Sequence, residues 1–189
     1  MPPNTKQDAI VETAFRLFKT NGFYATGVDL IMREAAVSKR TLYKYFPTKN
    51  ELIVAVIRHY QSNYRERLEA LLGNASESAR DKIRAIFHDA ATWFGDVNFH
   101  GCLAVNAMGE FAGKDQAIEN ACRQFKQWEL GVLQELCHGI GARQADQLAY
   151  KLWVLLEGMS AIAQVNKASS PVDMVAMADD IIEMHLPAR

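Results

Sequence analysis

The 189-residue sequence contains few helix-breaking prolines, and it lacks both the alternating pattern of β-strands and the long apolar runs of membrane-spanning helices. Its five prolines lie at the edges of helical patterns, and strand-like alternation of polar and apolar residues is absent. No apolar run approaches the roughly 18 residues that a membrane-spanning helix needs. The N-terminus MPPNTKQDAI contains no apolar signal segment, so we expect a cytoplasmic protein without a membrane partner.

Cysteine is also scarce, and the common catalytic motifs are missing. Cys102, Cys122 and Cys137 make an odd number and lack the spacing of a disulfide framework or a metal site. The nucleophile elbow, the phosphate-binding loop, the dinucleotide fingerprint and the zinc-protease motif are all absent. We therefore predict no catalytic residues, no bound metal and no cofactor.

The net charge of −1 hides an asymmetry along the chain. Residues 1–68 hold eleven Lys or Arg against six Asp or Glu, whereas residues 69–189 hold ten against sixteen. A basic N-terminal third on an acidic remainder fits a nucleic-acid-binding head attached to a different body. Charge alone does not decide, because a chance scatter of surface charges explains the same counts equally well.

Apolar residues recur three and four positions apart over most of the chain, which predicts an all-α fold. Capping boxes at Thr26 and Thr48, an N-cap at Ser38 and a C-cap at Gly22 mark helix ends. We predict a three-helix head over residues 1–50 and a helical body over 51–189, with about nine helices at 5–20, 28–35, 39–46, 49–72, 78–95, 102–112, 115–137, 143–167 and 171–186. The tight turn between the second and third helices has helix-turn-helix spacing.

The segment VSKRTLYKYFPTKNEL, residues 37–52, combines cations and aromatic residues in a way that a core helix does not need. Leu42 and Phe46 are four apart and should face the core of the head. The cations and hydroxyl groups then lie on the opposite surface. We predict a short helix with one face docked on the head and the other facing an anion.

The longer stretch GFYATGVDLIMREAAVSKRTLYKYFPTKNEL, residues 22–52, resembles the DNA-binding region of TetR-family transcriptional repressors. The helix-turn-helix, the LYKYF run and the Lys after PT fall in the family's order. Ala36 and Arg40 stand where glycine is frequent. The resemblance implies an all-α homodimer with one head per subunit and a ligand cavity in each body. It also implies that an unknown small-molecule effector moves the heads off adjacent major grooves.

The third helix is expected to recognise a double-stranded DNA operator. Residues at the start of a recognition helix enter the groove first, so Lys39 and Arg40 are the candidates for base contacts. The N-terminus of a helix favours the binding of phosphate. Residues at the starts of the helices on either side of the third are therefore also candidates for contacts with the DNA backbone. The full DNA-binding set is Thr26, Ser38, Lys39, Arg40, Thr41, Tyr43, Lys44, Tyr45, Thr48 and Lys49. A solvated basic helix, or a docking module for a protein, is the alternative.

The body is rich in aromatic residues, most of which should be core. A subset could line an apolar ligand cavity with a few polar groups. The candidates are Trp93, Phe94, His100, Cys102, Asn106, Phe111, Phe125, Trp128 and Trp153. Cys102 also allows a thiol-sensing repressor, since a thiol at a helix N-terminus can be reactive; an inert buried sulfur is the alternative.

The last two helices, residues 143–167 and 171–186, are the expected dimer surface. The EGMSAIA run, residues 157–163, holds small residues that let helices approach closely. Two such helices from each subunit would form a four-helix bundle. A two-fold dimer predicts a pseudo-palindromic operator.

Overall fold

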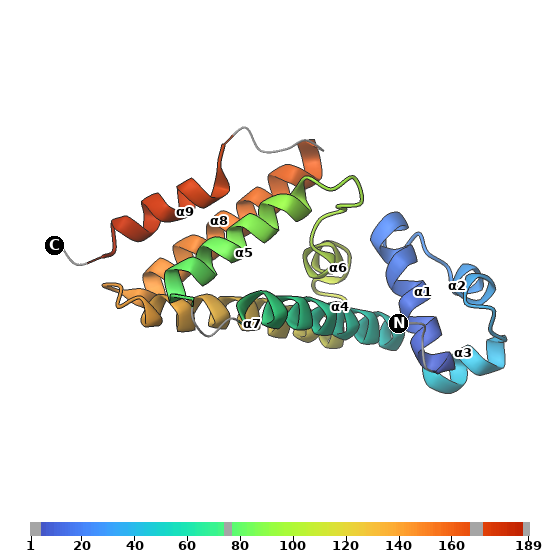
Figure 1. Ribbon diagram of the computed structural model, residues 1–189. Helices are drawn as coiled ribbons and strands as arrows, with labels where there is room; N and C mark the ends of the chain where they lie inside the picture. Colours follow the sequence, from blue (N-terminus) through green and yellow to red (C-terminus); the bar gives the residue numbers. More distant parts are fainter. Residues whose placement is uncertain (1–4, 74–76, 167–171, 187–189) are drawn as a thin grey trace. The chain divides into compact units, whose positions relative to one another are not determined.

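The structure is a computed structural model that describes residues 5–73, 77–166 and 172–186. Within these residues it contains nine α-helices and no strand, which confirms the all-α prediction (Figure 1). None of the helices in this part of the chain is long and apolar enough to cross a membrane.

The helices begin and end within three residues of their predicted bounds wherever those bounds can be compared. The predicted ends at 167 and 171 lie outside the described residues. The nine are α1 (Lys6–Asn21), α2 (Val28–Glu34), α3 (Lys39–Tyr45), α4 (Lys49–Leu72), α5 (Ala79–Phe94), α6 (Leu103–Phe111), α7 (Gln116–Gly139), α8 (Ala145–Asn166) and α9 (Met174–Glu183).

Three of the four caps predicted from the sequence are present. The Ser38 hydroxyl accepts the backbone N–H of Thr41 at 3.2 Å, and Thr48 accepts that of Glu51 at 3.1 Å. Gly22 closes α1 with a φ of 86°, a left-handed conformation that favours glycine. These caps fix the ends of the helices that make up the head.

The capping box predicted at Thr26 is wrong. The N-cap of α2 is Gly27, which supplies no side-chain hydrogen bond. Thr26 is instead fully buried, and its hydroxyl donates to the carbonyl oxygen of Gly22 at 2.7 Å. A buried hydroxyl needs a partner, and here the loop between α1 and α2 supplies one.

Contacts group the chain into two compact units. Unit 1 comprises Met1–Tyr64 with Cys102–Phe125, and unit 2 comprises Arg65–Gly101 with Lys126–Arg189. Helix α6 and the start of α7 therefore belong with the three N-terminal helices. The division at residue 50 stays a prediction about functional domains.

Each unit has its own apolar core. In unit 1, α1 packs against α2 and α3 over fully buried residues that include Ile10, Ile31 and Leu42. In unit 2, α5, α8 and α9 pack on one another over residues such as Phe87 and Leu152. Full burial of one such side chain is worth about 1.5–3 kcal/mol, so each core stabilises its unit.

Candidate nucleic-acid interface

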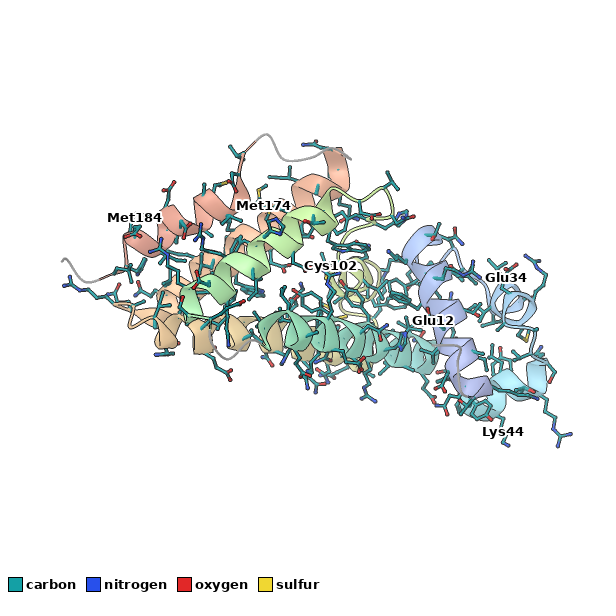
Figure 2. The ribbon with its side chains drawn as sticks, in the orientation of Figure 1. Glu12, Glu34, Lys44, Cys102, Met174 and Met184 are labelled. Atoms are coloured by element: carbon teal, nitrogen blue, oxygen red, sulfur yellow. The ribbon has the colours of Figure 1, made fainter. Side chains whose placement is uncertain are left out.

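Helix α3 has two chemically different faces. Leu42 is fully buried and Phe46 is 4% exposed, as the spacing predicts. Lys39, Arg40 and Lys44 are exposed, and Figure 2 shows Lys44 projecting away from the rest of unit 1. The buried face fixes the helix while the cationic face stays open to an anion.

The first turn of α3 is capped and exposed. Ser38 caps the helix, and its hydroxyl also lies 2.9 Å from that of Thr41. The first turn contains Lys39 and Arg40 and no acid. The positive end of the helix dipole therefore adds to two exposed cations, and together they make an electropositive tip.

The two tyrosines of α3, Tyr43 and Tyr45, are half-buried. The Lys44 Nζ lies 5.7 Å from the centre of the Tyr45 ring, within cation–π range. Part of each ring packs on the head, so a tyrosine contact with phosphate would use the exposed edge. Their assignment as phosphate ligands stays a prediction.

Thr26 does not fit the predicted DNA-binding set in this conformation. Its side chain is fully buried and its hydroxyl donates to Gly22. The hydroxyl has no path to a phosphate unless the loop between α1 and α2 opens. Its place in the fold is that of an anchor for this loop.

Thr48 and Lys49 lie at the start of α4, as expected, but the Lys49 side chain faces inward. Its Nζ donates to the carbonyl oxygen of Phe23 at 2.7 Å. Burial lowers the pKa of Lys49, and the nearby Glu110 carboxylate opposes that shift. A phosphate contact by Lys49 remains a prediction, and it competes with this internal bond.

Glu110 is a residue of unit 1 that the sequence did not single out. Its carboxylate accepts the backbone N–H groups of Phe23 at 2.9 Å and Tyr24 at 2.7 Å. These partners lie 87 and 86 positions away along the chain, so no local pattern reveals them. Helix α6 is thereby bonded to the loop that leads into the helix-turn-helix.

Ala36 adopts a φ of 51° in the turn between α2 and α3. This is the left-handed region, which L-residues other than glycine adopt at a cost of about 1–2 kcal/mol. Ala36 is one of the two positions where the family pattern favours glycine. The helix-turn-helix turn of this chain is therefore strained.

The nine candidate ligand residues are divided between the two units. Phe111 and Phe125 are buried in unit 1, where Cys102 and Asn106 are half-buried. The other five are half-buried in unit 2: Trp93, Phe94, His100, Trp128 and Trp153. Their role in binding a ligand remains a prediction.

Several of these aromatic rings have structural partners. The Phe111 ring stacks on that of Tyr24 at 4.9 Å, and Phe125 meets Tyr60 edge to face at 5.3 Å. In unit 2, the Arg65 guanidinium lies 4.9 Å from the Trp128 ring. Such contacts stabilise the fold whether or not a ligand also uses these rings.

Unit 2 contains a partly buried charge cluster between α7 and α8. Lys126 Nζ lies 2.7 Å from a carboxylate oxygen of Glu129 and 2.7 Å from one of Glu157. Burial raises the pKa of Glu129 to about 7, and the charge of Glu157 acts in the same direction. The indole N–H of Trp153 favours the ionised form of Glu129 and so acts to lower its pKa. This N–H group is buried, and it makes no hydrogen bond of normal geometry within the described residues.

A separate groove of about 530 Å³ lies on unit 2, outside the predicted set. It is lined by Leu71, Glu77, Asp81, Arg84, Ala85, His88, Asp89, Thr92 and Val175. Most of its charged groups already have partners, such as Arg84 with Asp179 at 3.2 Å. Among the described residues there is no group of His, Cys, Asp and Glu that could hold a metal ion.

Comparison with known proteins assigns this geometry to a class. Residues 10–56 match the model for "Bacterial regulatory proteins, tetR family", and residues 79–178 match the "Transcriptional regulator LmrA/YxaF-like, C-terminal domain". The chain therefore belongs to the TetR family of bacterial regulators. It is a DNA-binding transcriptional regulator and not an enzyme.

Individual bacterial regulators are similar in sequence to this protein over almost the whole chain. YxaF of Bacillus subtilis is 26% identical over 90% of this chain and 91% of its own. The repressor NemR of Escherichia coli is 24% identical over 92% of each chain. LmrA of Bacillus subtilis is 23% identical over 88% of this chain and 90% of its own.

Solved structures show the same fold. SCO4454, a TetR-family regulator from Streptomyces coelicolor, has a TM-score of 0.79 and 25% identity over 94% of this chain and 90% of its own. The reduced form of E. coli NemR has a TM-score of 0.84 and 22% identity over 97% and 99% of the two chains.

Proposed function

We propose that this regulator is a ligand-responsive repressor that binds a pseudo-palindromic operator as a homodimer. The observation that carries the proposal is α3, whose apolar face is buried while Lys39 and Arg40 are exposed at its capped start. A recognition helix of this kind reads base edges with its first residues. The repressor NemR, similar over nearly its full length, supports repression.

An exposed apolar stripe on α8 supports the dimer. Tyr150, Val154 and Ile162 are each about half exposed, at 54%, 52% and 53%. They share one helix face with the small residues Gly158 and Ala161, since positions 150, 154, 158 and 162 follow one another in steps of four and Ala161 lies three after Gly158. A contiguous apolar stripe on a soluble subunit marks an interaction surface.

Substitution of Ile162 tests the dimer directly. We expect Ile162→Asp to shift the protein toward monomer in sedimentation and to weaken operator binding, because a buried carboxylate at the interface has no partner. Thr92→Asp places the same charge on the exposed face of α5 and should leave both properties unchanged. A dimeric Ile162→Asp variant with wild-type affinity would contradict the proposed interface.

The response to a ligand is tested by displacement. A library of small molecules is added to the protein bound to a labelled operator, and release is followed by fluorescence anisotropy. A compound that releases DNA from the wild type should also raise the thermal midpoint of the free protein, since it binds the native state. A regulator that no compound displaces would contradict ligand response.

A thiol-sensing repressor is the second candidate. Cys102 is half-exposed at the N-cap of α6, where its side chain makes no capping hydrogen bond. Cys122 and Cys137 are buried, and burial raises the pKa of Cys137 to about 11. NemR, whose solved structure is described as a reduced form, is similar in sequence.

The thiol hypothesis predicts that electrophiles or oxidants release operator from the wild type and not from Cys102→Ser. Cys137→Ala is the matched control and should respond like the wild type, because its thiol is held protonated in the core. A wild-type protein that keeps its operator under such treatment rules the thiol hypothesis out.

A further inference from the structure

The loop between α1 and α2 is held by two charged side chains that bind its backbone. The Glu110 carboxylate accepts the N–H of Phe23 at 2.9 Å and of Tyr24 at 2.7 Å. Lys49 Nζ donates to the carbonyl oxygen of Phe23 at 2.7 Å. We call this arrangement of Glu110, Lys49 and the loop the Glu110 clasp. Hydrogen bonds to ionised groups are roughly twice as strong as neutral ones.

Aromatic packing surrounds the clasp. The Tyr24 ring stacks on Phe111 with centres 4.9 Å apart, and Phe23 meets Phe111 edge to face at 5.9 Å. Lys114 Nζ lies 5.2 Å from the centre of the Tyr24 ring. Phe111 follows Glu110 in α6, so polar and apolar contacts act on the same loop from the same helix.

A second polar contact ties the same region to α4. The Asn50 side-chain amide donates to the Asp115 carboxylate at 2.7 Å. Asp115 precedes α7, and Asn50 lies in the first turn of α4 next to Lys49. The start of α4 therefore touches both the clasp and the segment after α6.

The loop is shaped for a close approach of the carboxylate. Gly22 has a φ of 86°, and a Cβ at this position would lie 3.3 Å from Glu110 Oε1. A side chain there would be strained by the backbone and would press on the carboxylate. Glycine therefore suits both the backbone conformation and the close contact.

Glu110 occupies a place in α6 that is locally unfavourable for an acid. It lies in the last turn of the helix, where the carbonyl end of the dipole repels negative charge. Lys114 compensates in part, since its Nζ donates to the Glu110 carbonyl oxygen at 2.8 Å. A residue that opposes a local rule while making long-range contacts points to a role beyond helix formation.

We propose that Glu110 is a positioning residue for DNA recognition: through the clasp it holds the loop that leads into the helix-turn-helix, and so it fixes the orientation in which α3 meets the operator. Glu110 itself contacts no DNA. The inference rests on the proposed function, and it names the residue that holds the loop before the recognition helix.

The packing of the head explains how one carboxylate can position the recognition helix. The clasp holds backbone groups, so it fixes the path of the loop rather than a side-chain rotamer. Helix α1, which the loop follows, packs against both α2 and α3. A shift of the loop therefore reaches α3 through the packed core that α1 shares with α2 and α3.

The test compares Glu110→Gln with the wild type and a matched control. The amide keeps the size of the side chain but loses the charge, and we expect operator affinity to fall about tenfold. Because no phosphate contact is removed, the dependence of log Kd on log salt should keep its slope. The backbone amides of Phe23 and Tyr24 should exchange with solvent faster.

Glu119→Gln is the control. Glu119 Oε1 accepts the backbone N–H of Gly113 at 2.7 Å, which is the same kind of bond, but it joins the first turn of α7 to the segment just before it and does not touch the loop between α1 and α2. The control should lose comparable thermal stability and keep its operator affinity. Equal operator affinities for the two variants, or a changed salt slope for Glu110→Gln, would overturn the proposal.

The amide-exchange measurement needs no DNA, so it separates this inference from the proposed function. A wild type without any specific operator would refute the repressor. A wild type with an operator, combined with unchanged exchange at Phe23 and Tyr24 in Glu110→Gln, would refute the clasp alone.

Discussion

The Lys49 ammonium donates a hydrogen bond to the carbonyl oxygen of Phe23, 2.7 Å away. The sequence placed this cation at the start of α4 and predicted a phosphate contact for it. The structure confirms the place and gives the ammonium an acceptor within unit 1. The same side chain can therefore serve the loop or the DNA, and the two roles have different signatures in solution.

Lys49→Ala should weaken binding to operator and to unrelated duplexes by a similar factor. The loop loses one of its charged partners, and this changes the head as a whole rather than one base contact. We expect the salt slope of log Kd to stay at its wild-type value. A slope reduced by about one unit would show that the ammonium leaves Phe23 and binds a phosphate.

Arg40→Ala should weaken binding to the operator more than binding to other sequences. Arg40 is exposed in the first turn of α3, and an arginine that bonds a guanine with two hydrogen bonds contributes about 1–3 kcal/mol of discrimination. Titration of matched operator and scrambled duplexes measures the difference. An equal loss on both would make Arg40 a phosphate contact.

Ala36→Gly should stabilise the protein. Ala36 holds a φ of 51°, and glycine relieves the strain of the left-handed region while adding some freedom to the unfolded chain. The net gain should be up to about 1 kcal/mol, which raises the thermal midpoint by roughly 2–4 °C in a chain of this size. A lower midpoint than the wild type would show that the turn is not strained.

The free energy of unfolding should fall as the pH rises toward 8, in part because of Glu129. Its pKa is raised from 4.5 to about 7 in the folded state by burial. The stability that this group contributes is fully present below pH 4.5 and is lost as the pH rises through 7. The loss amounts to roughly 3 kcal/mol for a shift of this size.

Glu129→Gln removes the titrating group and leaves Lys126 with Glu157 as its partner. Lys126, Glu157 and the Trp153 indole face Glu129 from α7 and α8, so the variant isolates one member of a coupled cluster. We expect its urea-unfolding free energy to depend less on pH between 5 and 8 than that of the wild type. Parallel curves would mean that Glu129 keeps an ordinary pKa.

The sequence predicted the features that depend on neighbouring residues. Helix bounds, the caps at Ser38 and Thr48 and the inward direction of Leu42 and Phe46 follow from spacing and turn chemistry, which act over three to eight residues. Thr26 shows the limit of that argument. Its pattern is that of a capping box, but its hydroxyl binds Gly22 in the preceding loop instead.

Contacts between distant segments were beyond such reasoning. No local pattern marks Glu110, and only the fold brings it to Phe23 and Tyr24. The direction of the Lys49 side chain likewise depends on the folded position of Phe23, whose carbonyl oxygen accepts its hydrogen bond. Aromatic residues of the body could not be sorted into core and ligand contacts, because both uses require an apolar side chain at helical spacing.

The measurement that tests the central claim most directly is the selection of binding sites from a random duplex pool at physiological salt. If the regulator is a dimer with α3 as its recognition helix, we expect enrichment of a pseudo-palindrome whose two half-sites lie in adjacent major grooves. A folded, dimeric protein that enriches no sequence would contradict the claim.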